Sequence, residues 1–251
     1  MKRIGVVPYI NALPLIYSLS GYDIIKATPS ELSIQFGNKQ LDIALLPVYE
    51  LFNNVNVYIV DDISISSQDE SGSVLLFLNK PIVEAKNIGL DQSSLSSTHL
   101  LKLLMKEYYR LDCIFKNISP NKLVQESKNY DAYLLIGDQA INHRKVNDLF
   151  IDLGTIWNEW TNLPFVFAVW VTKNKDEKLK NDLLKSKEEG LLNIKQIINN
   201  ISYTDKHFLE NYYSYYLKFN LGNKEKQAIQ LFQKLLYKSK FISNKVELRY
   251  Y

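Results

Sequence analysis

The sequence predicts an α/β protein made of two lobes, each a mainly parallel sheet flanked by helices. Short apolar runs alternate with helical segments before residue 60, which is typical of a parallel sheet. A second series of the same kind begins at Asn87. Two apolar strands, 74–78 and 165–171, border this series, and we expect them to pair where the chain crosses between lobes. The lobes are then 1–76 plus 167–251 and 77–166, with a ligand cleft between them.

The first strand, expected over 4–7, runs into a tight turn and a helix start. Pro8 ends the strand, and Asn11 can cap a helix over 11–19 with its side-chain oxygen. Pro14 then stands in the first helical turn, where a missing N–H is harmless. Such a junction lies at the carboxyl end of a strand, where α/β proteins bind ligands. Asn11 is therefore either a plain helix cap or a residue of the ligand site.

The next elements place a second proline turn beside the first. Strands are expected over 22–27 and 42–46, and Pro47 ends the latter. Because parallel strands end at one edge of the sheet, the turns with Pro8 and Pro47 should be neighbours, with Tyr9 and Pro47 facing the cleft. Two further strands, 57–60 and 63–67, lead to a polar segment that contains Ser73.

The second series begins with a strand over 87–90 and a hydroxyl-rich turn over 91–98. Ser94, Ser96 and Ser97 stand at the start of the helix that follows. Hydroxyls and free N–H groups at a helix start can hold a carboxylate. The alternative is redundant helix capping by the same serines.

Later strands are expected over 113–116 and 132–136, and the second of these runs into Gly137 and Asp138. Glycine permits a close approach of the backbone to a ligand. Asp138 is the best general-base candidate in the chain, or else an ordinary helix cap. Its place at a helix start should stabilise the ionised form and lower its pKa.

The segment 157–170 holds all three tryptophans and ends in the apolar strand 165–171. We interpret Phe167 and Trp170 as core residues and expect Thr161 among the residues that bind the ligand. The remainder of the chain is expected to be helical, with Ala228, Ile229, Phe232, Leu235 and Leu236 on the last helix.

Composition excludes several classes of function. The net charge of +3 over 251 residues argues against nucleic-acid binding. Cys113 is the single cysteine, and His99, His143 and His207 lack metal-ligand spacing. The apolar run after Lys2 is too short for a signal peptide, and none elsewhere is long enough for a membrane helix, so a cytoplasmic protein is expected. Glycine-rich phosphate or dinucleotide loops are absent. These features favour a binder of a small anionic molecule.

Three segments, 7–15, 134–140 and 157–170, resemble the signatures of the chorismate dehydratases of the futalosine route to menaquinone. The resemblance implies a periplasmic-binding-protein-like (type II) fold without export. It also implies dehydration of chorismate to 3-[(1-carboxyvinyl)oxy]benzoate with no cofactor or metal. Nucleic acid and membrane are not expected as partners, and a homodimer is left open. Chorismate is thus the expected substrate.

The resemblance also bears on individual residues. Ser94, Ser96 and Ser97 would hold a substrate carboxylate, while Asn11 and Ser73 would reach the reacting edge. Family members often carry an arginine where this chain has Leu95, and a glycine where it has Asn162. The base is either Asp138 or the substrate's own side-chain carboxylate.

Two other functions stay open at this stage. One is a non-catalytic receptor for a small dicarboxylate. The other is the related 1,4-dihydroxy-6-naphthoate synthase, whose catalytic histidine would stand where this chain reads Gly137-Asp138.

Overall fold

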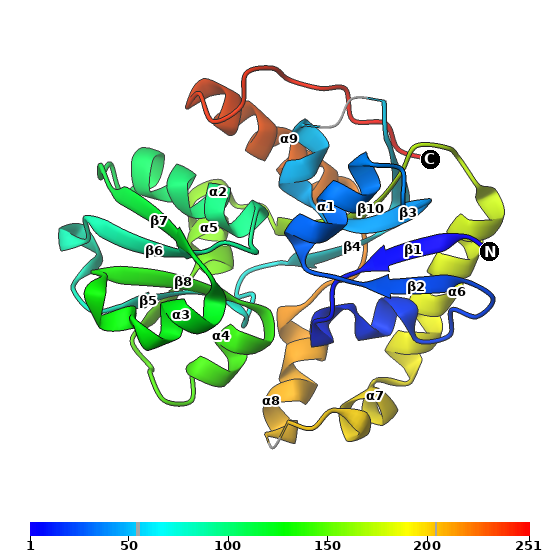
Figure 1. Cartoon of the computed structure of the whole chain (residues 1–251), viewed down its shortest axis with the longest axis horizontal. Helices are drawn as coiled ribbons and strands as arrows, with labels where there is room; N and C mark the ends of the chain where they lie inside the picture. Colours follow the sequence, from blue (N-terminus) through cyan, green and yellow to red (C-terminus); the bar gives the residue numbers. More distant parts are fainter. Residues whose placement is uncertain (54–55, 204) are drawn as a thin grey trace.

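The computed structural model describes residues 1–53, 56–203 and 205–251, and these form two lobes, each around a five-stranded sheet (Figure 1). The strand order is β2-β1-β3-β10-β4 in the first sheet and β7-β6-β8-β5-β9 in the second. In each sheet three neighbouring strands are parallel, and the remaining pairings are antiparallel. The predicted α/β architecture is confirmed.

The strands follow the apolar runs of the sequence. Those of the first sheet are β1 (Arg3–Val6), β2 (Asp23–Lys26), β3 (Ile43–Pro47), β4 (Tyr58–Ser67) and β10 (Phe165–Thr172). Those of the second sheet are β5 (Val74–Leu78), β6 (Asn87–Asp91), β7 (Ile114–Ile118), β8 (Ala132–Ile136) and β9 (Phe150–Asp152). The two strands expected over 57–60 and 63–67 are one strand, β4, in which Asp62 has a positive φ of 63°.

The helices cover the faces of both sheets. The α-helices are α1 (Pro29–Gly37), α2 (Ser96–Leu103), α3 (Pro120–Gln125), α4 (Gly137–His143), α5 (Leu153–Thr161), α6 (Glu177–Leu192), α7 (Ile194–Asn200), α8 (Lys206–Asn211) and α9 (Asn223–Lys238). Short 3₁₀ segments are η1 (Ile10–Ile16), η2 (Val48–Phe52), η3 (Ile82–Glu84) and η5 (Ser127–Asn129), and η4 (Leu104–Tyr108) and η6 (Tyr212–Tyr216) are π-helical.

The expected pairing of strand 74–78 with strand 165–171 is wrong. β10 runs antiparallel between β3 and β4, whereas β5 lies between β8 and β9. Both runs are apolar throughout, so neither shows a polar face that would identify its neighbours. The lobe boundaries expected at 76/77 and 166/167 fall inside β5 and β10. The chain leaves the first sheet after Ser67 and returns to it at Phe165.

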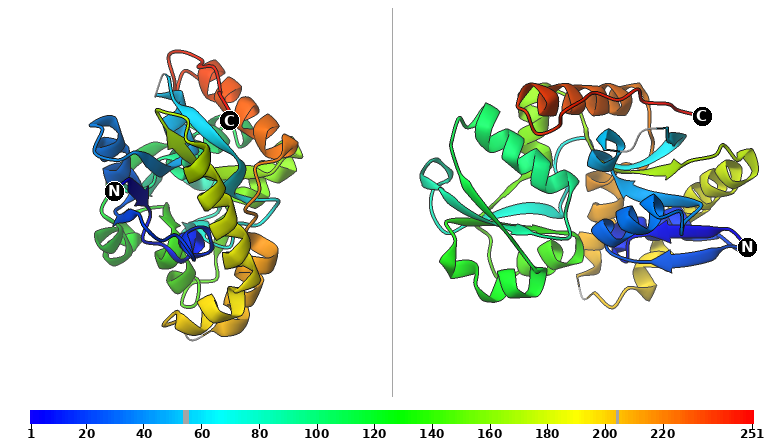
Figure 2. Two further views of the ribbon diagram at one scale, coloured as in Figure 1. Left: turned by 90° about the vertical axis from the view of Figure 1, so that its right-hand side faces the viewer. Right: turned by 45° about the horizontal axis from the view of Figure 1, so that its top comes forward.

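One hydrophobic cluster extends through both lobes. Trp157 of α5 contacts Phe165 of β10 and Phe232 of α9 with ring centroids 5.3 and 5.8 Å apart. Helix α9 packs on β10 in one lobe and on α2 in the other, and it lies along one side of the molecule (Figure 2). Shared aromatic packing therefore joins the lobes on that side.

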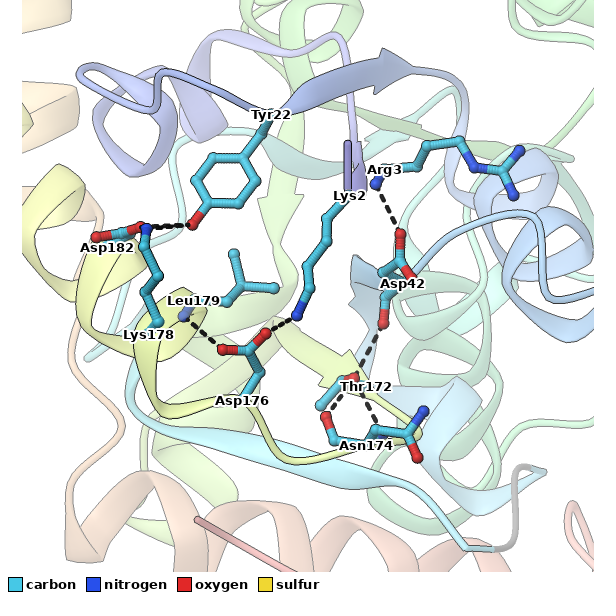
Figure 3. A network of polar contacts seen from close by, with 10 residues as sticks. All are labelled: Lys2, Arg3, Tyr22, Asp42, Thr172, Asn174, Asp176, Lys178, Leu179 and Asp182. Carbon is cyan, nitrogen blue, oxygen red and sulfur yellow. Dashed lines mark hydrogen bonds and ion pairs between the residues drawn. The ribbon is translucent and has the colours of Figure 1, made fainter.

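A polar network joins the strand ends at the end of the first sheet where β1 starts and β10 ends (Figure 3). Asp42 accepts a hydrogen bond from the Arg3 N–H at 2.7 Å, and its carbonyl accepts one from the Thr172 hydroxyl at 2.9 Å. Asp176 caps α6 and forms an ion pair with Lys2. Because β1 and β3 are parallel, their amino ends lie at this end of the sheet and their carboxyl ends lie at the other. The network therefore has a structural role.

Among the residues that the structure describes, none of the helices combines the length and the apolar character needed to span a membrane.

Candidate functional site

A cavity lies between the lobes, at the carboxyl ends of β1, β3 and β8. Such a position is where α/β proteins bind ligands. None of the described residues that line it carries a charge. They are Val7, Tyr9, Asn11, Pro29, Leu45, Pro47, Ile65, Ser73, Val74, Ser94, Leu95, Ser96, Ser97, Ile136, Gly137, Phe167, Ala168 and Leu217. The cavity therefore offers hydroxyl and amide groups in an apolar wall.

Asn11 lines this cavity and does not cap a helix. The extended residue before η1 is Tyr9, and Asn11 is the second residue inside η1. Pro14 lacks the N–H that an α-helix would direct to the Ile10 carbonyl, and this carbonyl accepts the Tyr213 hydroxyl at 2.7 Å instead. The Oδ1 atom of Asn11 is buried without a hydrogen-bond partner among the described residues. A buried acceptor of this kind is suited to a ligand donor.

In the hydroxyl-rich turn, Ser93 has a structural partner, and three other serines line the cavity. Asp91 accepts both the N–H and the hydroxyl of Ser93, at 2.8 and 2.5 Å. Ser94, Ser96 and Ser97 line the cavity, and α2 begins at Ser96. The first N–H groups of a helix have no partner inside it. This end of α2 therefore presents several neutral donors to the cavity.

A second contact joins this turn to the first lobe. The Tyr49 N–H of η2 donates to the Ser96 hydroxyl oxygen at 3.1 Å, which leaves the Ser96 O–H free to donate elsewhere. The Tyr49 ring stacks on His99 with centroids 3.5 Å apart. The His99 Nδ1–H donates to the Leu95 carbonyl at 2.9 Å, since a carbonyl can only accept. Burial lowers the pKa of His99 to about 4, so the ring is neutral at physiological pH.

Ser73 lies on the link between β4 and β5 and lines the cavity. Its hydroxyl oxygen accepts a hydrogen bond from Tyr212 at 2.8 Å, and its carbonyl accepts the Gly137 N–H at 2.8 Å. Sequence reasoning missed Tyr212, which is part of a tyrosine-rich segment with no periodic signal of its own. Both partners hold Ser73 at the cavity wall.

Gly137 begins α4 with a positive φ of 57° and lies against the ring of Tyr9. A Cβ atom at this position would lie 3.2 Å from Cγ of Tyr9, so a larger residue would press on that ring. Tyr9 is in the first lobe and Gly137 in the second, so this close packing joins them. Burial raises the pKa of Tyr9 to about 12, and its hydroxyl is therefore protonated at neutral pH.

Asp138 is placed beside the cavity and not in its wall. Its Oδ1 accepts the Ile10 N–H at 3.1 Å, and the side chain borders a separate pocket with Ile141 and Tyr203. Burial raises the pKa of Asp138, and the Ile10 N–H opposes this only in part. The expected lowering of its pKa is therefore wrong, because removal from water outweighs its position at a helix start. Its hydrogen bond links the second lobe to the turn that carries Asn11.

Two residues of the tryptophan segment are not where the sequence suggested. The Thr161 hydroxyl donates to the Trp157 carbonyl at 2.7 Å inside α5, and Thr161 does not reach the cavity. Phe167, expected in the core, lines the cavity from β10, next to Ala168. Residues 157–161 belong to α5, which begins after its cap Asp152, whose side chain accepts the Gly154 N–H.

Within residues 1–53, 56–203 and 205–251, no three side chains of His, Cys, Asp or Glu come together in a group that could hold a metal ion.

Comparison with known proteins assigns the family. A family model described as menaquinone biosynthesis matches residues 2–238. The chain belongs to the menaquinone biosynthesis family. A chorismate dehydratase from Thermus thermophilus is 27% identical over 223 residues, covering 77% of this chain and 79% of that protein. A chorismate dehydratase from Campylobacter jejuni is 27% identical over 244 residues, covering 92% and 95%.

A solved structure identifies the fold that this family member has. The Candida albicans CA3427 gene product is described as having the generic periplasmic binding protein structural fold. It superposes with a TM-score of 0.62 at 14% identity, over 99% of this chain and 97% of that chain. The chain therefore has a periplasmic-binding-protein-like fold, as the sequence resemblance implied.

Proposed function

We propose that the protein is a chorismate dehydratase, which converts chorismate to 3-[(1-carboxyvinyl)oxy]benzoate and water. The observation that carries this proposal is the cavity between the lobes, lined by hydroxyl and amide groups and by no charged side chain of the described residues. Two curated relatives of that name, each 27% identical, support it.

The proposed reaction is an elimination with no net oxidation or reduction. A base removes the proton from ring carbon C3, and the electron pair of that C–H bond enters the conjugated system that ends in the ring carboxylate. The bond from C4 to its hydroxyl then breaks, the hydroxyl leaves as water with the proton that the base took from C3, and the ring becomes aromatic. The protein must hold two carboxylates, stabilise the charge that develops on one of them and assist the leaving hydroxyl.

One substrate carboxylate is assigned to the start of α2. Ser94, Ser96 and Ser97 line the cavity there, and the Ser96 hydroxyl has its lone pair engaged by the Tyr49 N–H. Hydroxyl and N–H donors at a helix start stabilise an anion without a formal positive charge. Leu95 stands where other family members often carry an arginine, so neutral donors take the place of a cation in this proposal.

Asn11 is assigned to the leaving hydroxyl. Its side chain lines the cavity, and its buried Oδ1 has no partner among the described residues. An amide presents an acceptor and a donor side by side, so it can orient a ring hydroxyl and then stabilise its oxygen as the bond to C4 breaks. Ser73 lies on the same cavity wall and can support the same edge of the substrate.

The base is assigned to the substrate's own side-chain carboxylate, with Asp138 in a positioning role. Asp138 lies outside the cavity wall, and its Oδ1 accepts the Ile10 N–H. Through that bond it holds the turn that carries Asn11. A carboxylate of the substrate, fixed near C3 of the same molecule, gains the rate advantage of an intramolecular base.

The test is incubation of the purified protein with chorismate, with separation of the products by chromatography and identification by mass. We expect an aromatic dicarboxylate of mass lower than chorismate by one water. The Asn11→Ala variant, prepared in the same way, serves as the control for contaminating activity. Binding of 3-(carboxymethoxy)benzoate without turnover of chorismate would instead indicate the receptor function.

A further inference from the structure

Asp152, at the end of β9, receives hydrogen bonds from both segments that cross between the lobes. Its carboxylate accepts the Ser71 N–H at 3.0 Å, the Ser71 hydroxyl at 3.0 Å and the Gly72 N–H at 2.8 Å. These residues belong to the link from β4 to β5. The carboxylate also accepts the Gly154 N–H at 2.8 Å, at the start of the helix α5 that leads back to the first sheet. One side chain therefore joins the two crossings.

Capping of α5 does not account for this arrangement. A cap needs only the bond from Gly154, and a neutral asparagine caps a helix as well as aspartate does. The other three donated bonds come from a segment about 80 positions earlier in the chain. The two crossings also touch, because a Cβ atom on Gly154 would lie 2.4 Å from the Asp69 carbonyl oxygen.

The charge of Asp152 is deeply buried. Its exposed fraction is 7%, and no cationic partner for it occurs in the described part of the chain. Burial raises the pKa of Asp152 to about 6, while the bonds from Ser71, Gly72 and Gly154 act in the opposite direction. Every hydrogen bond at its two oxygens is donated to the carboxylate, as an ionised acceptor requires. An ionised acceptor forms stronger hydrogen bonds than a neutral one.

A short chain of contacts leads from Asp152 to the cavity. The Ser71 hydroxyl oxygen also accepts the Val74 N–H at 2.9 Å, so it fixes both ends of the turn that contains Ser73. Ser73 lines the cavity, and its carbonyl accepts the Gly137 N–H from the second lobe. Movement at Asp152 would therefore displace Ser73, a residue of the proposed site, and would change the angle between the lobes.

We propose that Asp152 is a positioning residue, whose ionised carboxylate clasps the two crossings and so favours the arrangement of the lobes in which Ser73 meets the substrate. The kinetic part of this inference rests on the proposed function. Loss of the clasp lowers the population of the closed arrangement, and a ligand that binds this arrangement then binds more weakly by the same factor. Turnover of substrate already bound in the closed arrangement is unaffected.

The test compares Asp152→Asn with Asp176→Asn at neutral pH. Asp176 also caps a helix, α6, but lies at the opposite edge of the first sheet, so it controls for loss of a capping charge. For Asp152→Asn we expect KM for chorismate to rise by about tenfold to a hundredfold, because one of the two acceptor oxygens becomes an NH2 group that cannot accept the bonds donated there, and the other oxygen loses its charge. We expect kcat per folded molecule to change by less than about threefold. Asp176→Asn should change neither constant.

Small-angle scattering provides a readout that does not depend on chemistry. Without ligand, Asp152→Asn should have a larger radius of gyration than the parent, and saturating 3-(carboxymethoxy)benzoate should remove the difference. If a folded Asp152→Asn protein has the KM and the radius of gyration of the parent, the proposed role of Asp152 is refuted. A fall in kcat with an unchanged KM would also refute it. If that variant does not fold, Ser71→Ala, which keeps the cap of α5, replaces it with the same criteria. A parent protein that fails to convert chorismate refutes the proposed function, and the scattering comparison still decides on the clasp.

Discussion

Replacement of Asn11 by alanine should lower kcat strongly, while the free energy of unfolding stays equal or rises slightly. The buried Oδ1 of Asn11 has no partner among the described residues, and Asn11 does not cap η1. Its removal therefore breaks no hydrogen bond of the described structure at that atom. An unpaired buried polar group costs about 1–3 kcal/mol. We expect the free energy of unfolding of Asn11→Ala to equal that of the parent or to exceed it by about 1 kcal/mol.

The expected effect on catalysis is much larger. Loss of one preorganised donor at a developing charge lowers kcat by about 10²–10³, or about 2.7–4 kcal/mol. The cavity has no charged side chain among its described lining residues that could replace the amide. Asn11→Ser tests reach, because serine keeps a hydroxyl on a shorter side chain. We expect its kcat to stay at least tenfold below that of the parent.

Both quantities are measured on the same preparations. Initial rates with chorismate give kcat, thermal and denaturant unfolding give stability, and calorimetry with 3-(carboxymethoxy)benzoate gives ligand affinity. Matched affinity with a low kcat would place the role of Asn11 in the chemical step. A lower melting temperature with a parental kcat per folded molecule would refute the reasoning, and full activity of Asn11→Ser would refute the role of the amide.

Two further predictions concern charge. Leu95→Arg should lower KM for chorismate by about tenfold and introduce a salt dependence of KM, whereas Leu95→Met should do neither; a folded Leu95→Arg protein with unchanged KM would show that the turn does not meet a carboxylate. Burial lowers the pKa of His99 to about 4 in the folded state, so the folded state favours the neutral ring. The contribution of His99 to the free energy of unfolding is therefore complete above pH 6.5, and it is lost as the pH falls toward 4 because the unfolded state takes up a proton first. The difference in unfolding free energy between the parent and His99→Gln should accordingly shrink by about 2–3 kcal/mol over that window in urea titrations, and a constant difference would contradict the low pKa.

The position of the cavity was predictable because it depends on where apolar runs end. Pro8 and Pro47 end two strands, β1 and β3, that are parallel neighbours. Gly137 ends β8 in the same way, and the serine turn follows β6. Within each sheet such ends lie side by side, so local signals sufficed to group Tyr9, Asn11 and Pro47 at the first sheet, and the serines and Gly137 at the second.

What the sequence could not indicate depends on contacts between distant segments. The partners of β5 and β10 are not encoded in the pattern of either strand, because each is apolar along its length except for Thr172 at the end of β10. The burial of Asp138 reversed the direction of its expected pKa shift, and burial is a property of the assembled lobes. Asp152 is not singled out by the sequence, and only the fold brings Ser71 and Gly72 to it.

The neutral cavity is consistent with the base assigned in the proposed reaction. A carboxylate that must accept a proton works best when its pKa is not lowered by a nearby cation, and removal from water raises that pKa further. An arginine at the position of Leu95 would bind the substrate more tightly but would also weaken the basicity of its carboxylates. Hydroxyl and N–H donors at the start of α2 orient an anion with a smaller effect of this kind, since they carry no full charge. Leu95→Arg should therefore lower kcat as well as KM, and the pH at which kcat is half-maximal should fall.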